Sequence, residues 1–152
     1  MTKDILGHIS YSFSDYVAMP NVPQPSLVER MIYTHGKTVI VGKPKFGKSY
    51  LGIKIGLSVA LGQPLLNLKV TQAPVLLLEF DRRFLVNIIH EISGGQKTEM
   101  MHIIPAQGLA LNEFEGYRFL LASIRKFCPK DNGQLLVVID HKSACFAGKA
   151  HL

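Results

Sequence analysis

At 152 residues the chain has the length of one domain, and 47% of its residues are hydrophobic, which is enough for a sizeable core. Its formal net charge of +6 suits an anionic partner such as a nucleotide or a nucleic acid, and its basic residues are spread without a dense run. Two cysteines without zinc-type spacing exclude a disulfide scaffold and a cysteine-based zinc site. The N-terminus lacks the features of a signal peptide, and the apolar region at about Tyr50–Leu66 is interrupted by Lys54 and Pro64. We therefore expect a cytoplasmic protein that does not associate with membranes.

The first part of the chain shows little periodicity. Pro20 and Pro23 interrupt residues 1–24 and Pro25 follows them, which predicts an irregular N-terminal arm with a short strand near Tyr11–Val17. The sequence Ser26–Glu29 fits a capping box, which predicts a short helix to about Tyr33. Residues 25–152 are then expected to form a single nucleotide-binding domain.

The central motif is Gly42–Ser49, which fits G-x-x-x-x-G-K-[ST], the phosphate-binding P-loop. The apolar residues of Lys37–Val41 predict a buried strand before the loop, and Ser49–Leu61 predicts a helix after it. Within this helix Gly52 and Gly56 indicate close packing against a sheet. The residues predicted to bind a nucleotide are Gly42, Lys43, Pro44, Lys45, Phe46, Gly47, Lys48, Ser49 and Tyr50.

The chemistry of this loop follows from its residue types. Glycines allow the backbone amides of the loop to turn toward an anion at the positive end of the helix dipole. We expect Lys48 to reach the β- and γ-phosphates of ATP and the Ser49 hydroxyl to bind Mg²⁺. Pro44 has no amide hydrogen and can only stiffen the loop. Lys43 and Lys45 are either direct ligands or solvated flanking residues.

Helices and strands alternate after the loop. Continuous apolar runs predict buried strands at Val75–Asp81 and Leu135–Asp140, and Met101–Ile104 is predicted to form a short strand between them. Apolar residues at helical spacing predict helices at Arg82–Ser93 and from about residue 112 to about 127. This order predicts an α/β fold with a mostly parallel sheet, in which ligands bind at the carboxyl ends of the strands.

Three acidic residues lie at predicted strand ends. Asp140 follows five apolar residues, as a Walker B aspartate does, and would hold Mg²⁺ opposite Ser49. The alternative is an ordinary strand-terminal aspartate that caps the next turn. Glu79 and Asp81 share a face and are candidates for the base that polarises the attacking water, although Asp81 also suits the N-cap of the next helix. Lys48, Glu79 and Asp81 are thus the predicted catalytic residues.

These motifs together resemble the RecA-like AAA ATPases of the RepA/DnaB helicase type. The resemblance covers about residues 24–145 and includes the G-x-P-K-x-G-K-S form of the loop, the segment Ala60–Pro64 and the strand Val137–Asp140. It implies a P-loop NTPase domain with a RecA-like three-layer sandwich, which binds ATP or ADP and hydrolyses ATP with Mg²⁺. It further implies single-stranded DNA as a partner and a hexamer when the protein is full length.

Two departures from the family pattern stand out. The family usually has Glu-Asp after its second strand, and the register here places Asp81 where the catalytic Glu normally lies, so either hydrolysis is slower or Glu79 substitutes. After the Walker B strand the family has a further strand that carries a polar sensor residue. In the sheet this strand lies between the P-loop strand and the Walker B strand, whereas this sequence ends at Leu152. We therefore expect a domain truncated after the Walker B strand, with a gap in its sheet and poor stability alone.

Three functions remain open from the sequence. The first is an ATPase motor of the helicase or replication type. The second is a small-molecule or nucleotide kinase, for which the sequence shows no acceptor site and no arginine-rich lid. The third is a nucleotide-binding module without turnover, which the expected truncation and the register of Asp81 favour.

Overall fold

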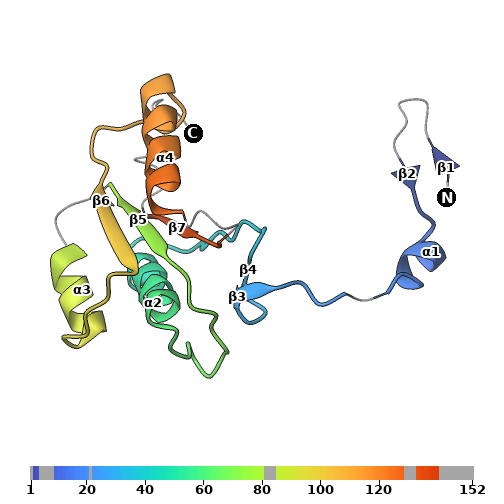
Figure 1. Ribbon diagram of the computed structural model, residues 1–152, viewed down its shortest axis with the longest axis horizontal. Helices are drawn as coiled ribbons and strands as arrows, with labels where there is room; N and C mark the ends of the chain where they lie inside the picture. The colour runs from blue at the N-terminus through green and yellow to red at the C-terminus, as the bar shows by residue number, and fades with distance from the viewer. Residues whose placement is uncertain (1, 4–8, 21, 81–84, 129–132, 141–152) are drawn as a thin grey trace.

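The structure is a computed structural model that describes residues 2–3, 9–20, 22–80, 85–128 and 133–140 (Figure 1). The elements in chain order are β1 (Thr2–Lys3), β2 (Ile9–Ser10), α1 (Phe13–Val17), β3 (Ser26–Val28), β4 (Ile32–Tyr33), α2 (Lys48–Leu61), β5 (Val75–Glu79), α3 (Leu85–Ser93), β6 (Met101–Pro105), α4 (Phe114–Phe127) and β7 (Leu136–Asp140). No helix in these ranges combines the length and the apolar character that crossing a bilayer requires.

A parallel three-stranded sheet forms the centre of the fold. Its order is β6-β5-β7, and β5 pairs in parallel with both neighbours. The four residues Val75–Leu78 of β5 are each 0% exposed, because both faces of the strand are covered. The predicted parallel strands are thus confirmed, with β5 ending at Glu79 and β7 at Asp140. The burial predicted for Leu135–Asp140 was wrong in part, because β7 is an edge of the sheet and Ile139 is 43% exposed. The α/β fold class of a P-loop NTPase is confirmed as well.

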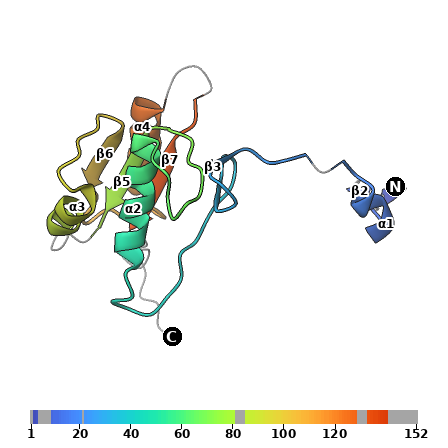
Figure 2. The ribbon, with the colours of Figure 1, turned by 90° about the horizontal axis from the view of Figure 1, so that it is seen from below.

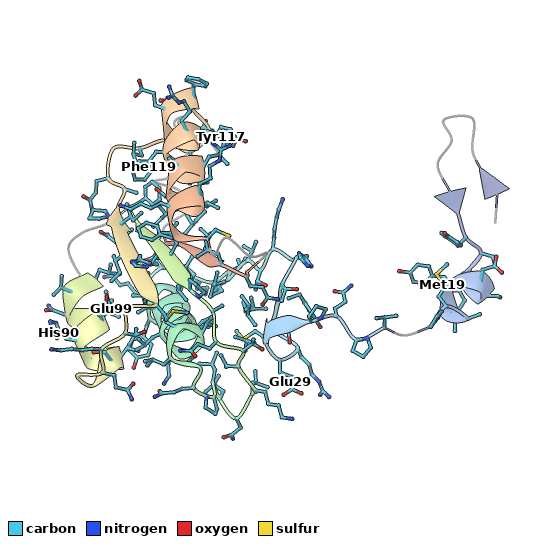
Figure 3. All side chains as sticks on the ribbon, in the orientation of Figure 1. Met19, Glu29, His90, Glu99, Tyr117 and Phe119 are labelled. Atoms are coloured by element: carbon cyan, nitrogen blue, oxygen red, sulfur yellow. The ribbon has the colours of Figure 1, made fainter. Side chains whose placement is uncertain are left out.

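Helices cover both faces of this sheet, which gives three layers (Figures 1 and 2). Alternate residues of β5 point to opposite faces. Val75 and Leu77 belong to apolar clusters with residues of α2 and α3, whereas Leu78 packs in a cluster with Phe119 of α4. Phe119 and Tyr117 leave α4 on different sides, and Phe119 faces the sheet (Figure 3). Glu79 therefore points to the face that α2 covers.

Helix α2 packs closely against the sheet through its two glycines, as predicted. A Cβ atom added to Gly56 would lie 3.3 Å from Val75 Cγ1, and one added to Gly52 would lie 3.7 Å from Val138 Cγ1. The helix ends at Gly62, which has a φ of 66° and whose amide donates to the carbonyls of Ser58 and Val59. This packing places the N-terminus of α2 at the carboxyl ends of β5 and β7.

The strand predicted before the P-loop is not formed, and this prediction was wrong. Residues 37–41 have no strand conformation, and Val39 and Val41 are 70% and 87% exposed. Thr38 Oγ1 donates to the carbonyl of Met31 at 3.2 Å, which holds the segment beside the preceding turn. The physical reason is that a strand needs a neighbour for its backbone groups, and within the described ranges residues 37–41 pair with no strand, since the sheet ends at β6 on one side and at β7 on the other. Apolar, β-branched sequence alone does not provide this neighbour.

The short helix predicted from Ser26 to about Tyr33 is also wrong. This stretch forms the antiparallel pair β3–β4 instead. The carbonyl of Leu27 accepts from the amide of Thr71 at 2.8 Å, and the amide of Glu29 donates to the carbonyl of Lys69 at 2.9 Å. Leu27 is buried against the cluster that contains α2 residues. Tertiary pairing and burial have therefore overridden the local capping-box signal.

The N-terminal arm differs from its prediction in detail. Tyr11–Val17 does not form a strand, because Phe13–Val17 is the helix α1, which Ser12 and Asp15 open as a capping box. None of the residues of α1 is buried, and the arm extends away from the sheet in Figures 1 and 2. Helices α3 and α4 occur where the periodicity predicts them, although the predicted start of α3 at Arg82 falls outside the described residues.

Candidate nucleotide-binding site

The P-loop contains a tight turn that its sequence explains. The amide of Phe46 donates to the carbonyl of Lys43 at 3.4 Å, so Pro44 and Lys45 occupy the two central positions of the turn. Lys45 has a φ of 66°, and proline followed by a positive φ is the pattern of a type II turn. Pro44 therefore presets the turn by fixing its own φ.

The backbone after this turn is arranged to bind an anion. Lys45 and Gly47 have φ values of 66° and 73°, whereas Phe46 between them is not among the residues with positive φ. Such alternation turns successive N–H groups toward one side and forms an anion-binding concavity. Gly47 is also the N-cap of α2, so the positive end of the helix dipole adds to the attraction. The donors in this loop thus fit a phosphate group.

The side chain of Lys48 folds back onto the first residues of the loop. Its Nζ donates to the carbonyl of Gly42 at 3.0 Å and to the carbonyl of Lys43 at 2.8 Å. The ammonium group is therefore held by carbonyls at the start of the loop. Lys48 itself is the first residue of α2 and directly follows Gly47. A phosphate bound to those amides would lie within reach of this charge.

Ser49 and Asp140 meet although they are 91 residues apart in the sequence. The hydroxyl Oγ of Ser49, in the first turn of α2, donates to Oδ1 of Asp140, the last residue of β7, at 2.9 Å. A hydroxyl and a carboxylate side by side are hard oxygen ligands of the kind that Mg²⁺ prefers. Among the described residues no group of three or more His, Cys, Asp and Glu gathers around one point. The pair suits Mg²⁺, which keeps several water ligands when it is bound with a nucleotide.

Glu79 lies next to Asp140 at the carboxyl end of the sheet. The two residues are register partners on neighbouring parallel strands, so their side chains leave the same face. Glu79 is only 3% exposed, and its Oε2 accepts from Nε2 of Gln107 at 3.0 Å. The structure thereby brings Ser49, Asp140 and Glu79 to one edge, where the strand-end rule placed them.

Gln107 was missed by the sequence reasoning. It follows β6, the third parallel strand, and precedes Gly108, whose φ is 78°. A polar residue two positions after the end of a parallel strand is a signal similar to that used for Glu79 and Asp140. Applying the strand-end rule to all three strands would have identified it.

The other predicted site residues have exposed side chains or lie outside the described residues. Asp81, the second candidate for the catalytic acid, lies beyond the part of the chain that is described. The side chains of Lys43 and Lys45 are exposed, as are those of Phe46 and Tyr50, which are 75% and 37% exposed. These four side chains point to solvent, so their part in the site rests on the backbone or on groups that approach from outside.

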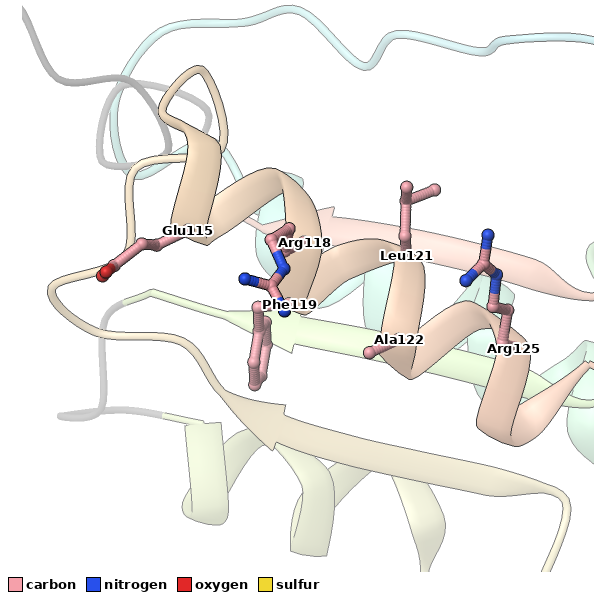
Figure 4. Close-up of a pocket in the computed structure, with 6 residues that line it drawn as sticks. All are labelled: Glu115, Arg118, Phe119, Leu121, Ala122 and Arg125. Carbon is pink, nitrogen blue, oxygen red and sulfur yellow. The ribbon is translucent and has the colours of Figure 1, made fainter.

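A surface hollow lies elsewhere, along α4 (Figure 4). Its lining residues all come from this helix and are Glu115, Arg118, Phe119, Leu121, Ala122 and Arg125. Phe119 points toward the sheet, whereas Leu121 and Arg125 point away from it (Figure 4). None of the residues predicted to bind a nucleotide lines this hollow. The candidate site is therefore the loop and the strand ends alone.

Replacing Gly47 tests whether the conformation of the loop, and not its composition, binds the nucleotide. A Cβ at this position meets no atom within 4 Å, so Gly47→Ala introduces only the cost of a positive φ, about 1–2 kcal/mol. We expect the Kd for ATP to rise about tenfold in Gly47→Ala. Asparagine tolerates a positive φ better, so Gly47→Asn should bind more tightly than Gly47→Ala. Isothermal titration calorimetry measures both, and equal weakening by the two variants would contradict the conformational explanation.

The comparisons with known proteins agree with this geometry. The sequence model of the AAA domain family matches residues 3–151, which is nearly the whole chain. The searches of curated proteins and of solved structures returned no match. A P-loop with a lysine over it, a serine–aspartate pair at the end of a parallel strand and a family match over this length lead to one conclusion: the chain belongs to the AAA domain family of P-loop ATPases.

Proposed function

We propose that the chain binds ATP with Mg²⁺ at the loop Gly42–Ser49 and hydrolyses it as the nucleotide-binding part of a RecA-like motor that acts on DNA. The hydrogen bond of 2.9 Å between Ser49 and Asp140 carries this proposal. It joins the helix after the P-loop to the end of a parallel strand through the two side chains expected to bind the metal ion. Membership of the AAA domain family supports nucleotide binding and ATPase activity in general.

Each residue of the site has a role in this proposal. Lys48 and the amides of the loop bind the phosphates and offset their negative charge. Ser49 and Asp140 hold the metal ion, which when bound neutralises the charge that develops on the transferred phosphoryl group. Glu79 accepts a proton from the attacking water or orients it, and Asp81 is the alternative for this role.

A nucleotide-binding module without turnover is the second candidate function. It is favoured by segment 37–41, which pairs with no strand within the described ranges. The upstream side of the loop is held there only by the packing of Ile40 and by the hydrogen bond of Thr38 to Met31. Positioning to within about 1 Å decides the rate of a chemical step far more than it decides binding. A loop whose upstream side has no strand pairing would thus bind ATP and hydrolyse it slowly.

We also propose a nucleic-acid partner, an oligomeric state and the bounds of the domain. Single-stranded DNA as a partner is supported by the net charge of +6, which favours association with a polyanion. A hexamer of the full-length protein follows from the resemblance to the helicase type. We assign residues 25–152 to the nucleotide-binding domain and residues 1–24 to an arm that precedes it.

Asp140→Asn tests the proposal through the metal ion. Wild-type protein should release phosphate from ATP without any acceptor, only with Mg²⁺, and faster with single-stranded DNA. In Asp140→Asn the Mg²⁺ concentration for half-maximal activity should rise about 10–100-fold, because an amide is a poorer metal ligand than a carboxylate. Phosphate release at varied Mg²⁺ measures this.

The control is Glu91→Gln, which makes the same carboxylate-to-amide change at an exposed position of α3. It should leave the Mg²⁺ dependence unchanged. ATP binding without phosphate release from the wild type would select the module without turnover. Formation of ADP that requires an acceptor and releases no free phosphate would select a kinase, because the phosphoryl group then passes to the acceptor. A wild type that does not bind ATP would refute all three functions.

A further inference from the structure

We propose that Gln107 is a positioning residue that fixes the orientation of the Glu79 carboxylate for ATP hydrolysis. The inference rests on the function proposed above and adds a residue that neither the P-loop nor the Walker B motif contains. Its central observation is the hydrogen bond of 3.0 Å from Nε2 of Gln107 to Oε2 of Glu79.

The order of the strands shows on which side of Glu79 the Gln107 side chain lies. Strand β5 lies between β6 and β7, so Gln107, which follows β6, and Asp140, which ends β7, flank Glu79 from opposite sides. The amide of Gln107 therefore draws Oε2 toward β6, on the side away from Asp140. Neighbouring strands are only about 4.8 Å apart, and two carboxylates at this spacing repel each other. Gln107 thus keeps the predicted base apart from the predicted metal ligand.

Glu79 needs such a partner to hold one orientation. The terminal torsion of a glutamate side chain has broad, shallow preferences, so packing alone does not fix the plane of the carboxylate. A general base has to lie within hydrogen-bond reach of the water that it activates, and its orientation decides whether it does. A donor to one carboxylate oxygen selects the plane and with it the position of the other oxygen.

The donor is itself held by a short turn. The amide of Ala106 donates to the carbonyl of Glu79 at 2.7 Å, and the amide of Leu109 donates to the carbonyl of Ala106 at 3.2 Å. Gly108, with a φ of 78°, allows the chain to reverse at this point. The backbone that carries Gln107 is thus tied to the same strand end that carries Glu79. This double attachment distinguishes a positioning residue from a surface side chain that touches the carboxylate by chance.

Gln107→Met tests the inference, because methionine has a similar length and no amide donor. We expect kcat for ATP hydrolysis to fall about tenfold with an unchanged KM and an unchanged Kd for ATP, since the phosphates are bound elsewhere. Gln107 is exposed, so the variant should fold, which far-ultraviolet circular dichroism checks. Gln96→Met, the same change at an exposed residue after α3, is the control and should have wild-type kcat.

A double-mutant cycle with Glu79→Gln separates positioning from a general structural effect. If Gln107 acts through the carboxylate, Gln107→Met should not lower kcat further once Glu79→Gln has removed it. Loss of the hydrogen bond should also lower Tm by about 2–4 °C in the wild-type background, a readout that does not depend on activity.

Each outcome decides the inference. A lowered kcat with unchanged KM and no further loss in the double variant supports it. An unchanged kcat in Gln107→Met, or equal losses in both backgrounds, overturns it while ATP hydrolysis by the wild type stands. No phosphate release from the wild type overturns the inference and the proposed turnover together.

Discussion

Lys48→Ala should raise the Kd for ATP about 10–100-fold and abolish detectable hydrolysis. The ammonium group is held over the loop by the carbonyls of Gly42 and Lys43, so its charge is already placed when the phosphates arrive. A hydrogen bond to a charged group contributes about 1.5–3 kcal/mol, and about 1.4 kcal/mol corresponds to a tenfold change in affinity. Calorimetric titration of ATP into the two proteins measures the difference.

The control for this variant is Lys54→Ala, on the same helix but exposed. It removes the same charge from the protein and should bind ATP like the wild type. Both carbonyls that Lys48 contacts belong to exposed residues, so water can replace the lost partner and Tm should not change. Equal ATP affinity of Lys48→Ala and the wild type would show that the phosphates do not bind at this loop.

Leu77→Ala should lower the free energy of unfolding by about 2–5 kcal/mol. Leu77 is 0% exposed at the centre of β5 and packs in a cluster with Ile53 of α2 and Leu85 of α3. Removing buried methyl groups costs their transfer free energy and leaves a cavity that the neighbours fill only in part. Urea unfolding followed by circular dichroism gives the difference from the shift of the midpoint.

Leu66→Ala is the matched control, because Leu66 is 72% exposed and the same atoms are removed. Its φ of 49° is equally unfavourable for leucine and alanine, so the backbone contribution cancels. The free energy of unfolding should change by less than about 0.5 kcal/mol. If Leu77→Ala were as stable as Leu66→Ala, β5 would not be the centre of the core.

The sequence predicts those parts of the fold whose signals are local and strong. Val75–Glu79 and Leu136–Asp140 are continuous apolar runs that end in an acid, and such runs are typical of parallel strands, although only β5 is buried along its whole length. Glycine spacing in α2 predicts its close packing on the sheet. Because β5 and β7 pair in parallel, their carboxyl ends lie at the same edge of the sheet, and Asp140 is beside Glu79.

The sequence fails where a long-range partner decides the structure. Ser26–Val28 carries a capping signal, but pairing with residues near Lys69 and Thr71 makes it a strand. Residues 37–41 have the composition of a strand and no hydrogen-bonded neighbour within the described ranges. Gln107 belongs to no motif, and the strand-end rule gives only its position, because its role depends on one hydrogen bond to a residue 28 positions away.

Segment 37–41, which pairs with no strand within the described ranges, has a thermodynamic consequence for the site. Fixing a residue in a single backbone conformation costs about 1–2 kcal/mol, and this segment leads directly into the phosphate-binding amides. ATP binding and strand pairing would both order this segment, so whichever occurs second does not have to overcome the same loss of backbone entropy again. Pairing of residues 37–41 with another strand would therefore raise the affinity for ATP, and bound ATP would raise the affinity of that pairing by the same factor. The affinity for ATP should therefore depend on whether residues 37–41 are paired with a strand.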